Sequence, residues 1–482
     1  MKKRLFNIGF CFVISFIIVA LYSTSTSFLY TEPSAGDSAI FMTIGKYWAE
    51  GFVPYVDFWD SKGPMIFFVN ALGFALVHSK YGIFIIQLLS LSIAVYYIFR
   101  LYRTTFNQLW SLCLTTLSIF SIGMIYDGGN TAEEYLLPFL TYSFYSLYRY
   151  GLKYEQTGDS FHPVRWAFVY GIVTSFSLMT RLTNAVGICV AVAFISVVLL
   201  SRRKWKNLLL NGIAFILGFL LLLLPFVIYF SSKNALEEMW YGTLFYNIDY
   251  AERSGFTITG LRGVLGFLLR FVNSYLLFIA SLFLLFLKKD KVNTLLWLFV
   301  SGVTLAWFFK SNGFGHYVLI ALPYPCIAIV MLKRQFTACN DYVRRVILYS
   351  FIGSYSILVF GGCIYSTWLF DNLYRTNINL MDCRKILHDL PTDYKQSFLA
   401  YNCPPDLYIY TDTRPYCRFF TIQDWAVKCS STLLPRVRAT LSENTPTWFM
   451  LKGNPSYVIE GFLQNNYDIY KESGRYTLYH RR

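Results

Sequence analysis

Charged residues are scarce in this sequence. They make up 14% of the 482 residues, whereas globular domains carry about 25%. Hydrophobic residues make up 55% of the chain, and the mean hydropathy is +0.44. A soluble enzyme needs a largely polar surface, and this composition does not supply one. The composition therefore argues against a soluble protein and favours one that lies in a membrane.

Metal-binding patterns are also missing. No Cys-x-x-Cys pair and no Cys/His cluster has the spacing of a zinc site. The loop at residues 30–64 contains no Asp-x-Asp motif. We therefore predict neither a metal ion nor any other cofactor. We find no internal repeat and no low-complexity tract.

Apolar runs that approach or exceed the length needed to cross a bilayer recur through the first three quarters of the chain. They predict about eleven transmembrane helices, of which 134–148 and 166–180 are short. The second run comprises a short leading helix and a full crossing. The predicted spans are 5–29, 65–99, 108–126, 134–148, 166–180, 184–200, 207–230, 263–287, 292–309, 316–332 and 346–368.

Basic residues are distributed unevenly over the junctions between these spans. Nineteen lysines and arginines occupy alternate junctions at residues 2–4, 100–103, 149–165, 202–206, 288–291 and 333–345. The opposite junctions hold seven, namely Lys46, Lys62, Arg181, Lys233, Arg253, Arg262 and Lys310. The positive-inside rule then predicts a cytoplasmic amino terminus and an extracytoplasmic carboxy-terminal segment. Topology accounts for most of the net charge of +15, so nucleic acid is not an expected partner.

The amino terminus also has features of a secretory signal peptide. Basic residues precede an apolar stretch, and Ser23-x-Ser25 is an acceptable cleavage site. The apolar stretch continues to Leu29 and is longer than the hydrophobic region of most signal peptides, which favours a retained membrane helix.

A soluble domain is predicted at residues 371–482, after a membrane domain at residues 1–370. Charges and prolines become frequent there. We expect strands at 408–411 and 448–451, helices at 376–390, 430–442 and 456–464, and a hairpin over 467–479 that turns at Gly474. These elements describe a small α/β domain. The domain contains four cysteines, Cys383, Cys403, Cys417 and Cys429. They could form two disulfides in an oxidising compartment or remain free thiols.

The first outer loop, residues 30–64, concentrates polar residues beside the membrane. Asp37 stands at the start of a predicted amphipathic helix that ends at Gly51, and Asp60-Ser-Lys62-Gly-Pro64 closes the loop. An acidic side chain in a membrane-embedded cavity suits a general base, because burial raises its pKa towards the working range. Gly-Asp-Ser at 36–38 is also a plausible helix cap, and capping does not exclude catalysis.

These motifs, in this order, resemble the GT-C glycosyltransferases that use polyprenyl-phosphate sugars, of the glycosyltransferase family 39 type. That group contains protein O-mannosyltransferases and the aminoarabinose transferases of lipid A. The resemblance rests on Asp37, the Val53-Pro54-Tyr55 turn, the acidic-x-Lys-x-Pro element at 60–64 and the later Gly-His-Tyr at 315–317. Two departures weaken any subfamily assignment: Asp37-Ser38 replaces the Asp-Glu pair of many relatives, and Lys62-Gly63-Pro64 replaces Lys-Pro-Pro.

The resemblance implies an inverting transfer with Asp37 as the base and no covalent sugar intermediate. Relatives often carry an acidic residue where the third span ends, which here is Asp127, and we interpret it as a second catalytic acidic residue, with Glu134 in a weaker, substrate-binding role. The glycines at 128 and 129 permit a tight turn there. The alternative is a helical hairpin in which residues 130–133 cap the next helix.

Cations are needed to hold the departing lipid phosphate. Arg181 lies between two apolar runs on the outer side, and its planar guanidinium suits phosphate, with Lys62 as a second cation. The resemblance implies that His316 and Tyr317 approach the donor, and Asp60 completes the substrate-binding set. The alternatives are snorkelling to the surface for Arg181 and Lys62, and an ordinary polar role for His316.

We therefore predict an all-α polytopic membrane protein of the GT-C type with a small extracytoplasmic α/β domain. Its expected function is transfer of a sugar from a polyprenyl-phosphate donor to an extracytoplasmic acceptor in the cell envelope, which is lipid A, another glycan or a protein. Its active site would lie on the periplasmic side of the inner membrane. An O-antigen polymerase or ligase and a lipid-linked sugar transporter or flippase are the alternatives. Transporters usually carry ionisable residues within the crossings, whereas here they gather in outer loops.

Overall fold

The computed structural model describes residues 2–482 apart from short gaps at 33–34, 254–270, 288–290, 311–313, 338–341, 374–377, 422–423 and 431. The start of the predicted span 263–287 falls in one gap, and Arg262, Lys288 and Lys289 also lie outside the described residues. The chain divides into two compact units. Unit 1 comprises Met1–Ser23, Ile85–Phe226 and Gly255–Leu369, and unit 2 comprises Thr24–Phe84, Val227–Ser254 and Phe370–Arg482.

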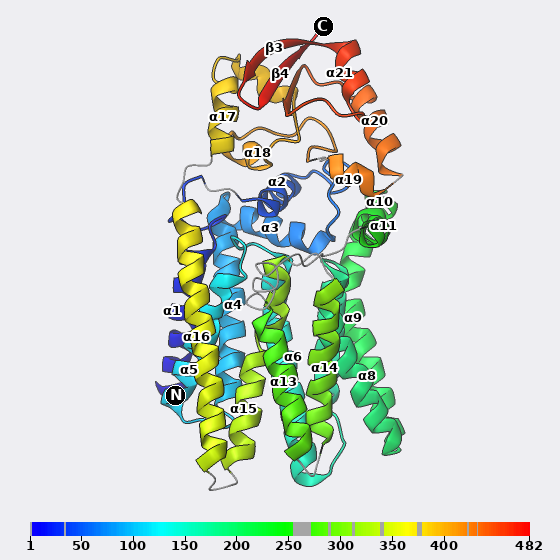
Figure 1. Cartoon of the computed structure of the whole chain (residues 1–482). Coiled ribbons are helices and arrows are strands. Elements are labelled where there is room, and N and C mark those ends of the chain that lie inside the picture. The colour runs from blue at the N-terminus through cyan, green and yellow to red at the C-terminus, as the bar shows by residue number, and fades with distance from the viewer. Residues whose placement is uncertain are drawn as a thin grey trace. The chain divides into compact units, whose positions relative to one another are not determined.

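Unit 1 is built from helices, most of which run alongside one another (Figure 1). Short 3₁₀ turns, η1 (Ser121–Met124), η2 (Leu182–Ala185) and η4 (Gly315–Ala321), interrupt the helical segments. The helices are α1 (Lys2–Tyr22), α4 (Lys80–Tyr102, from Ile85), α5 (Gln108–Phe120), α6 (Ala132–Thr157), α7 (Val164–Leu178), α8 (Val186–Ser201), α9 (Trp205–Ser232, to Phe226), α13 (Val272–Leu287), α14 (Val292–Lys310), α15 (Tyr324–Thr337) and α16 (Tyr342–Leu373, to Leu369).

Each of the eleven predicted spans overlaps a helix of the described residues, and the chain is a multi-pass membrane protein. Among the described residues, seven helical segments are long and apolar enough to cross a membrane, with four shorter apolar helices besides. Helix α6, which carries the predicted span 134–148, is not among these segments. The seven are Lys2–Tyr22, Lys80–Tyr102, Leu182–Ser201, Trp205–Ser232, Val292–Lys310, Gly315–Phe336 and Arg345–Ile364.

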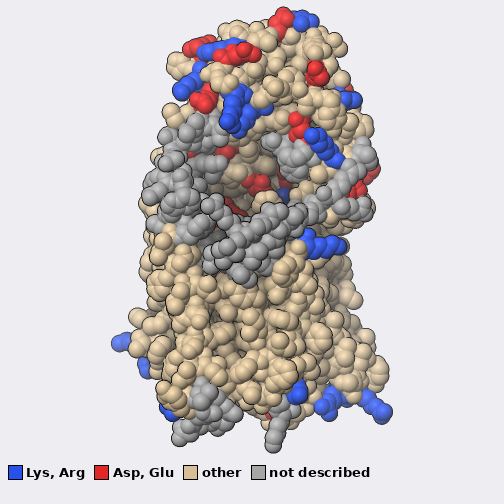
Figure 2. Space-filling view, in the orientation of Figure 1, with Lys and Arg blue, Asp and Glu red and all other residues tan. Residues whose placement is uncertain are grey.

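Glycine allows α7 and α9 to pack closely. A Cβ atom on Gly218 of α9 would overlap the carbonyl of Phe168, and one on Gly171 of α7 would overlap the carbonyl of Phe215. Small residues at such crossings let helix backbones approach in a membrane, where dispersion replaces hydrophobic exclusion as the driving force. Figure 2 shows mostly uncharged side chains over the helices of unit 1, with lysine and arginine at their lower end in the view. On the part of unit 2 that contains the sheet, residues of both charge signs gather.

Unit 2 combines the first outer loop, a middle segment and the carboxy-terminal region. The loop forms α2 (Asp37–Ala49) and α3 (Pro64–Val77), and the middle segment forms α10 (Leu236–Trp240), a π-helical turn η3 (Tyr241–Phe245) and α11 (Tyr246–Arg253). The carboxy-terminal region forms α17 (Ile378–Leu387), η5 (Thr392–Gln396), β1 (Phe398–Tyr401), α18 (Asp406–Tyr410), α19 (Asp424–Cys429), α20 (Leu433–Glu443), β2 (Trp448–Lys452), α21 (Glu460–Asn466), β3 (Tyr467–Ser473) and β4 (Tyr476–Arg481).

The four strands form one sheet in the order β1-β2-β4-β3. Figure 1 labels two of them, β3 and β4. β1 pairs with β2 in parallel, with Phe398 opposite Trp448, and the other pairs are antiparallel. β1, an edge strand, is buried along its whole length, and the central strand β2 is buried along all but its last residue. Burial on both faces is typical of parallel strands in an α/β layer. The hairpin of β3 and β4 turns at Gly474, whose φ of +61° suits glycine.

The sequence predictions for this region are mostly confirmed, with one error. The strand at 448–451, the hairpin and helices that overlap 376–390, 430–442 and 456–464 are present. The strand predicted at 408–411 is wrong, because residues 406–410 form α18. Pro404 and Pro405 precede this helix and Asp406 occupies its first turn, two signals that favour a helix start and that the alternating Tyr-Ile-Tyr pattern obscured.

Candidate functional site

Asp37 is the first residue of α2 in unit 2. Gly36, with a φ of +51°, occupies the capping position before it, so Asp37 is not the helix cap. The Asp37 side chain is 60% exposed, and its Oδ2 atom lies 3.8 Å from the Lys62 ammonium. A carboxylate in the first turn is favoured by the helix dipole. Asp37 is thus an accessible carboxylate beside one cation.

Asp60 and Lys62 lie on the segment that leads into α3. The Lys62 backbone amide donates to Asp60 Oδ1 at 3.0 Å. Burial raises the pKa of the Asp60 carboxyl above its usual value, the Lys62 ammonium lowers it, and the negative charge of Asp37 raises it further. Asp37, Asp60 and Lys62 therefore form one electrostatic group, which we call the loop group.

The backbone of the loop group is held by one residue from earlier in the same loop and by one from α11. The buried Tyr55 hydroxyl donates to the Lys62 carbonyl at 2.7 Å, and the Asn247 side chain donates to the Ser61 carbonyl at 2.7 Å. Pro64 at the first position of α3 has a fixed φ that suits a helix start. Sequence reasoning did not single out Asn247, because an asparagine in an aromatic stretch gives no signal of its partner.

Asp127 lies in a tight turn of unit 1 between η1 and α6. Residues 127–130 all have positive φ values, from 48° to 84°, and two of the four are glycines. A Cβ on Gly129 would overlap the Ser23 hydroxyl and crowd the Tyr126 ring. This turn places Asp127 Oδ2 3.0 Å from the His316 backbone amide, which donates to it, and 2.9 Å from His316 Nδ1.

Arg181, at the start of η2, stacks on Tyr317. Its guanidinium carbon lies 3.0 Å from the centre of the Tyr317 ring, and Nη1 lies 3.5 Å from Glu133 Oε1. The Asn184 side chain donates to the same Glu133 oxygen at 3.1 Å. Glu133 is buried, so this carboxylate orients the guanidinium. Sequence reasoning considered Glu133 only as part of a helix cap.

The rings of His316 and Tyr317 join these contacts into one chain. They meet edge to face with centroids 4.6 Å apart. Asp127, His316, Tyr317, Arg181 and Glu133 therefore form a continuous series of side chains in unit 1, which we call the bundle group. Four of its five members were predicted as site residues from the sequence.

Glu134 is bonded elsewhere. Its fully buried carboxylate accepts hydrogen bonds from the Tyr126 hydroxyl, the Gln87 amide at 2.9 Å and the Asn130 backbone amide at 2.9 Å. Successive residues of a helix point about 100° apart, which explains why Glu133 contacts Arg181 and Glu134 does not share that contact.

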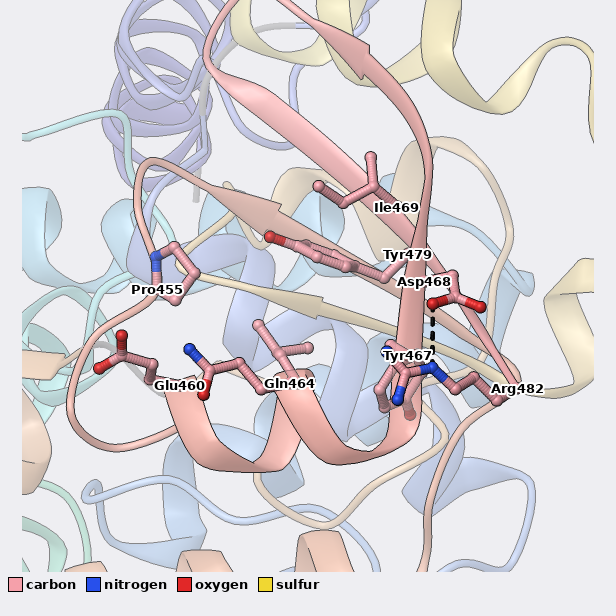
Figure 3. A pocket seen from close by; sticks show the side chains of 9 residues that line it. Pro455, Glu460, Gln464, Tyr467, Asp468, Ile469, Tyr479 and Arg482 are labelled. Carbon is pink, nitrogen blue, oxygen red and sulfur yellow. Dashed lines mark hydrogen bonds and ion pairs between the residues drawn. The ribbon is translucent and has the colours of Figure 1, made fainter.

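Within the described ranges, no group of three or more His, Cys, Asp or Glu side chains is placed to hold a metal ion. Within the part of the chain that the structure describes, Cys383, Cys403, Cys417 and Cys429 form no disulfide with one another. A cavity of about 420 Å³ lies in the sheet region of unit 2, and Figure 3 shows Tyr479, Gln464 and Arg482 around it. None of the sequence-predicted site residues lines this cavity. Its lining residues are Pro455, Glu460, Leu463, Gln464, Tyr467, Asp468, Ile469, Tyr479 and Arg482.

Comparison with known proteins identifies a sequence family and a fold. A family model described as the putative competence-induced protein Ccs4 N-terminal domain matches residues 3–338. No curated protein sequence matches the chain.

Several solved structures are similar to the chain over nearly all its length. ArnT from Cupriavidus metallidurans, bound to undecaprenyl phosphate, matches 99% of this chain and 98% of its own at 12% identity, with a TM-score of 0.61. The apo oligosaccharyltransferase of Archaeoglobus fulgidus matches 93% of this chain and 69% of its own at 12% identity and a TM-score of 0.59. The oligosaccharyltransferase AglB of Archaeoglobus fulgidus, in complex with an inhibitory peptide and a dolichol-phosphate, gives 10% identity and a TM-score of 0.51 over 93% of this chain and 70% of its own. The predicted GT-C fold is confirmed.

Proposed function

Because the chain belongs to the family of the putative competence-induced protein Ccs4 N-terminal domain and has the GT-C fold, we propose that it is an integral membrane glycosyltransferase. The donor is a polyprenyl-phosphate sugar, and the acceptor is a hydroxyl group of lipid A, another glycan or a protein outside the cytoplasm. The solved neighbours support this proposal through what they hold, undecaprenyl phosphate in ArnT and a dolichol-phosphate in AglB. At 10 to 12% identity, the neighbours' activities cannot be assigned to this chain, so the proposal depends on the site residues.

The loop group is the observation that carries the proposal. It sets the accessible carboxylate of Asp37 3.8 Å from a lysine ammonium and beside the half-buried Asp60. Glycosyl transfer from a phosphate requires both functions, a base for the acceptor hydroxyl and a cation for the leaving phosphate. In the proposed step Asp37 takes the hydroxyl proton as the acceptor oxygen attacks the anomeric carbon. The bond from that carbon to the phosphate oxygen breaks, with inversion and without a metal ion.

The bundle group contributes the second set of proposed contacts. Arg181 is oriented by Glu133 and Tyr317, so its remaining guanidinium N–H groups are directed without a large entropy cost. We assign Arg181 to the donor phosphate with Lys62 as the second cation, and His316 and Tyr317 to the donor itself. Asp127 orients His316 and is the second acidic site residue, and Asp60 and Glu134 support the substrate-binding surfaces.

The proposed orientation places the amino terminus in the cytoplasm and residues 371–482 outside it as a separate soluble domain. This orientation rests on the excess of cations at alternate junctions. It puts the loop at 30–64 on the side where a lipid-linked sugar is used.

The experiment that tests this function is a lipid analysis of the host. Membranes of a strain that lacks the gene are compared with those of strains complemented by the wild type, by Asp37→Asn or by Asp57→Asn. Asp57 is the matched control, because it is an acid of the same loop whose Oδ2 accepts from the Val53 amide at 2.6 Å. We expect one polyprenyl-phosphate sugar to accumulate in the deletion strain and in the strain complemented by Asp37→Asn. It should not accumulate in the strains complemented by the wild type or by Asp57→Asn. Unchanged levels of every such lipid would refute the proposal.

A further inference from the structure

The amino-terminal end of α2 is held by the carboxy-terminal region of the chain. The Ala35 backbone amide donates to Asp406 Oδ1 at 2.5 Å. Ala35 opens the turn that starts α2, because its carbonyl accepts from the Ser38 amide at 3.0 Å. The anchored residue is thus two positions before Asp37, and the anchor comes from residue 406, far along the sequence. All of these residues belong to unit 2.

Two ion pairs flank this hydrogen bond. Arg384 Nη1 lies 2.6 Å from both carboxylate oxygens of Glu32, and Arg384 Nη2 donates to the Tyr410 carbonyl at 2.8 Å. At the other end of α2, Lys46 pairs with Asp412. Helix α2 is therefore tied to α17 and to the segment around α18 before its first residue and near its last turn.

The three ties differ in strength. The Asp412 side chain is 75% exposed and that of Glu32 is 41% exposed, so water screens both ion pairs. Asp406 is 1% exposed and accepts a backbone hydrogen bond in a site without competing solvent. Loss of a buried acceptor leaves the partner amide unsatisfied, which costs more than loss of a surface pair.

We propose that Asp406 is a positioning residue that fixes the turn at Ala35 and thereby the location of the Asp37 carboxylate, with Arg384 as an auxiliary tie. The inference deepens the proposed function, because it assumes that Asp37 is the base. It gives the carboxy-terminal region a role in transfer through the helix that carries Asp37.

Hydrogen exchange of the full-length protein in detergent tests the anchoring without any substrate. Asp406→Ala removes the acceptor, whereas Asp406→Asn keeps an oxygen at the same place. We expect amides at 35–42 to exchange about tenfold or more faster in Asp406→Ala than in the wild type, with Asp406→Asn close to the wild type. Asp424→Ala is the matched control, because Asp424 accepts from Tyr401 and Ser456 within the carboxy-terminal region and makes none of these ties to α2.

Kinetics test the consequence for transfer. The donor is the polyprenyl-phosphate sugar purified from the deletion strain, and the acceptor is the host envelope fraction. We expect Asp406→Ala to lower kcat about tenfold to a hundredfold with the donor KM unchanged, because a displaced base slows the chemical step and leaves donor binding intact. Asp406→Asn should restore kcat to within about twofold, and Arg384→Gln should lower it several-fold.

The outcomes distinguish failure of the positioning role of Asp406 from failure of the proposed function. Slower transfer by Asp406→Ala with faster exchange at 35–42 and rescue by Asp406→Asn supports positioning. Unchanged exchange at 35–42 in Asp406→Ala overturns it, whatever Arg384→Gln shows and whatever the enzyme does. Faster exchange with wild-type kcat also overturns it, because Asp37 would then not need the anchor. If the wild type transfers no sugar, the proposed function fails, and with it the role of the anchor in transfer. The exchange experiment would still decide whether Asp406 holds the turn.

Discussion

The bundle group and the loop group differ in how far their charges are already paired within the protein. In the bundle group Arg181 lies between the buried Glu133 and the Tyr317 ring, and Asp127 is bonded twice to His316. In the loop group Asp37 is 60% exposed and has a cation only at 3.8 Å. A paired and oriented arginine suits a fixed binding role, whereas an accessible carboxylate suits proton transfer. The contrast therefore separates binding residues from the residue proposed to react.

The largest expected effect comes from removing the accessible carboxylate. Asp37→Asn should reduce transfer by at least about a hundredfold, because general-base catalysis contributes roughly 10² to 10⁴ in rate. Sugar transfer by purified protein from the lipid donor measures this effect, with Asp57→Asn as the control. Retention of full activity by Asp37→Asn would break the contrast between the groups.

A smaller effect is expected in the bundle group. Arg181→Lys keeps the charge but loses the planar guanidinium, and we expect the donor KM to rise about tenfold with kcat changed less. Initial rates over a range of donor concentrations measure it. Arg100→Lys is the control, because Arg100 also lies beside tyrosine rings but in the last turn of α4. An equal rise in both variants would show that the loss is structural.

The Asp406 carboxyl predicts a pH-dependent difference in stability. Burial raises its pKa to about 6, although the Ala35 hydrogen bond opposes the shift. A raised pKa gives stability that is complete below the unfolded pKa and is lost as pH rises through about 6, by up to about 3 kcal/mol. Asp406→Asn should therefore unfold at a higher temperature than the wild type at pH 7.5, and the gap should shrink at pH 4.5. Thermal unfolding of the full-length protein at both pH values measures the gap, and a gap independent of pH would contradict the assignment.

The smallest effect is expected at the surface of the sheet. Asp468 pairs with Arg482 at 2.9 Å, but their side chains are 71% and 53% exposed. Asp468→Asn should change the free energy of unfolding by less than about 1 kcal/mol and leave transfer unchanged. A clear loss of transfer would instead assign a functional role to the neighbouring cavity, which the two site groups do not require.

The sequence predicts much of the fold because its strongest signal is local. Apolar runs identify membrane helices directly, and each predicted span overlaps a helix of the described residues. The strand predicted at 408–411 failed because its alternation of tyrosine and isoleucine outweighed the helix-start signal of Pro404, Pro405 and Asp406. The division into domains at 370 and 371 stays a prediction, and the compact units join the first outer loop to the carboxy-terminal region.

The candidate site was only partly accessible to sequence reasoning. Asp127, Arg181, His316 and Tyr317 were chosen separately, and the structure brings them into one series of contacts. Glu133 was missed because the sequence does not show which of two adjacent glutamates faces Arg181. That depends on the direction in which the helix orients each side chain. Asp406 and Asn247 were missed because their partners lie far along the sequence, and no local pattern encodes such pairings. The roles assigned to the site residues remain predictions.

Unit 2 is assembled from three stretches separated by long helical segments. During synthesis the loop that carries Asp37 is made hundreds of residues before Asp406, Arg384 and Asp412, which hold its helix. Contacts between such distant residues form late and slowly. The ribosome therefore finishes almost the whole chain before α2 acquires these ties. A polypeptide cut short after residue 369 would retain Asp37 but lack Asp406, Arg384 and Asp412.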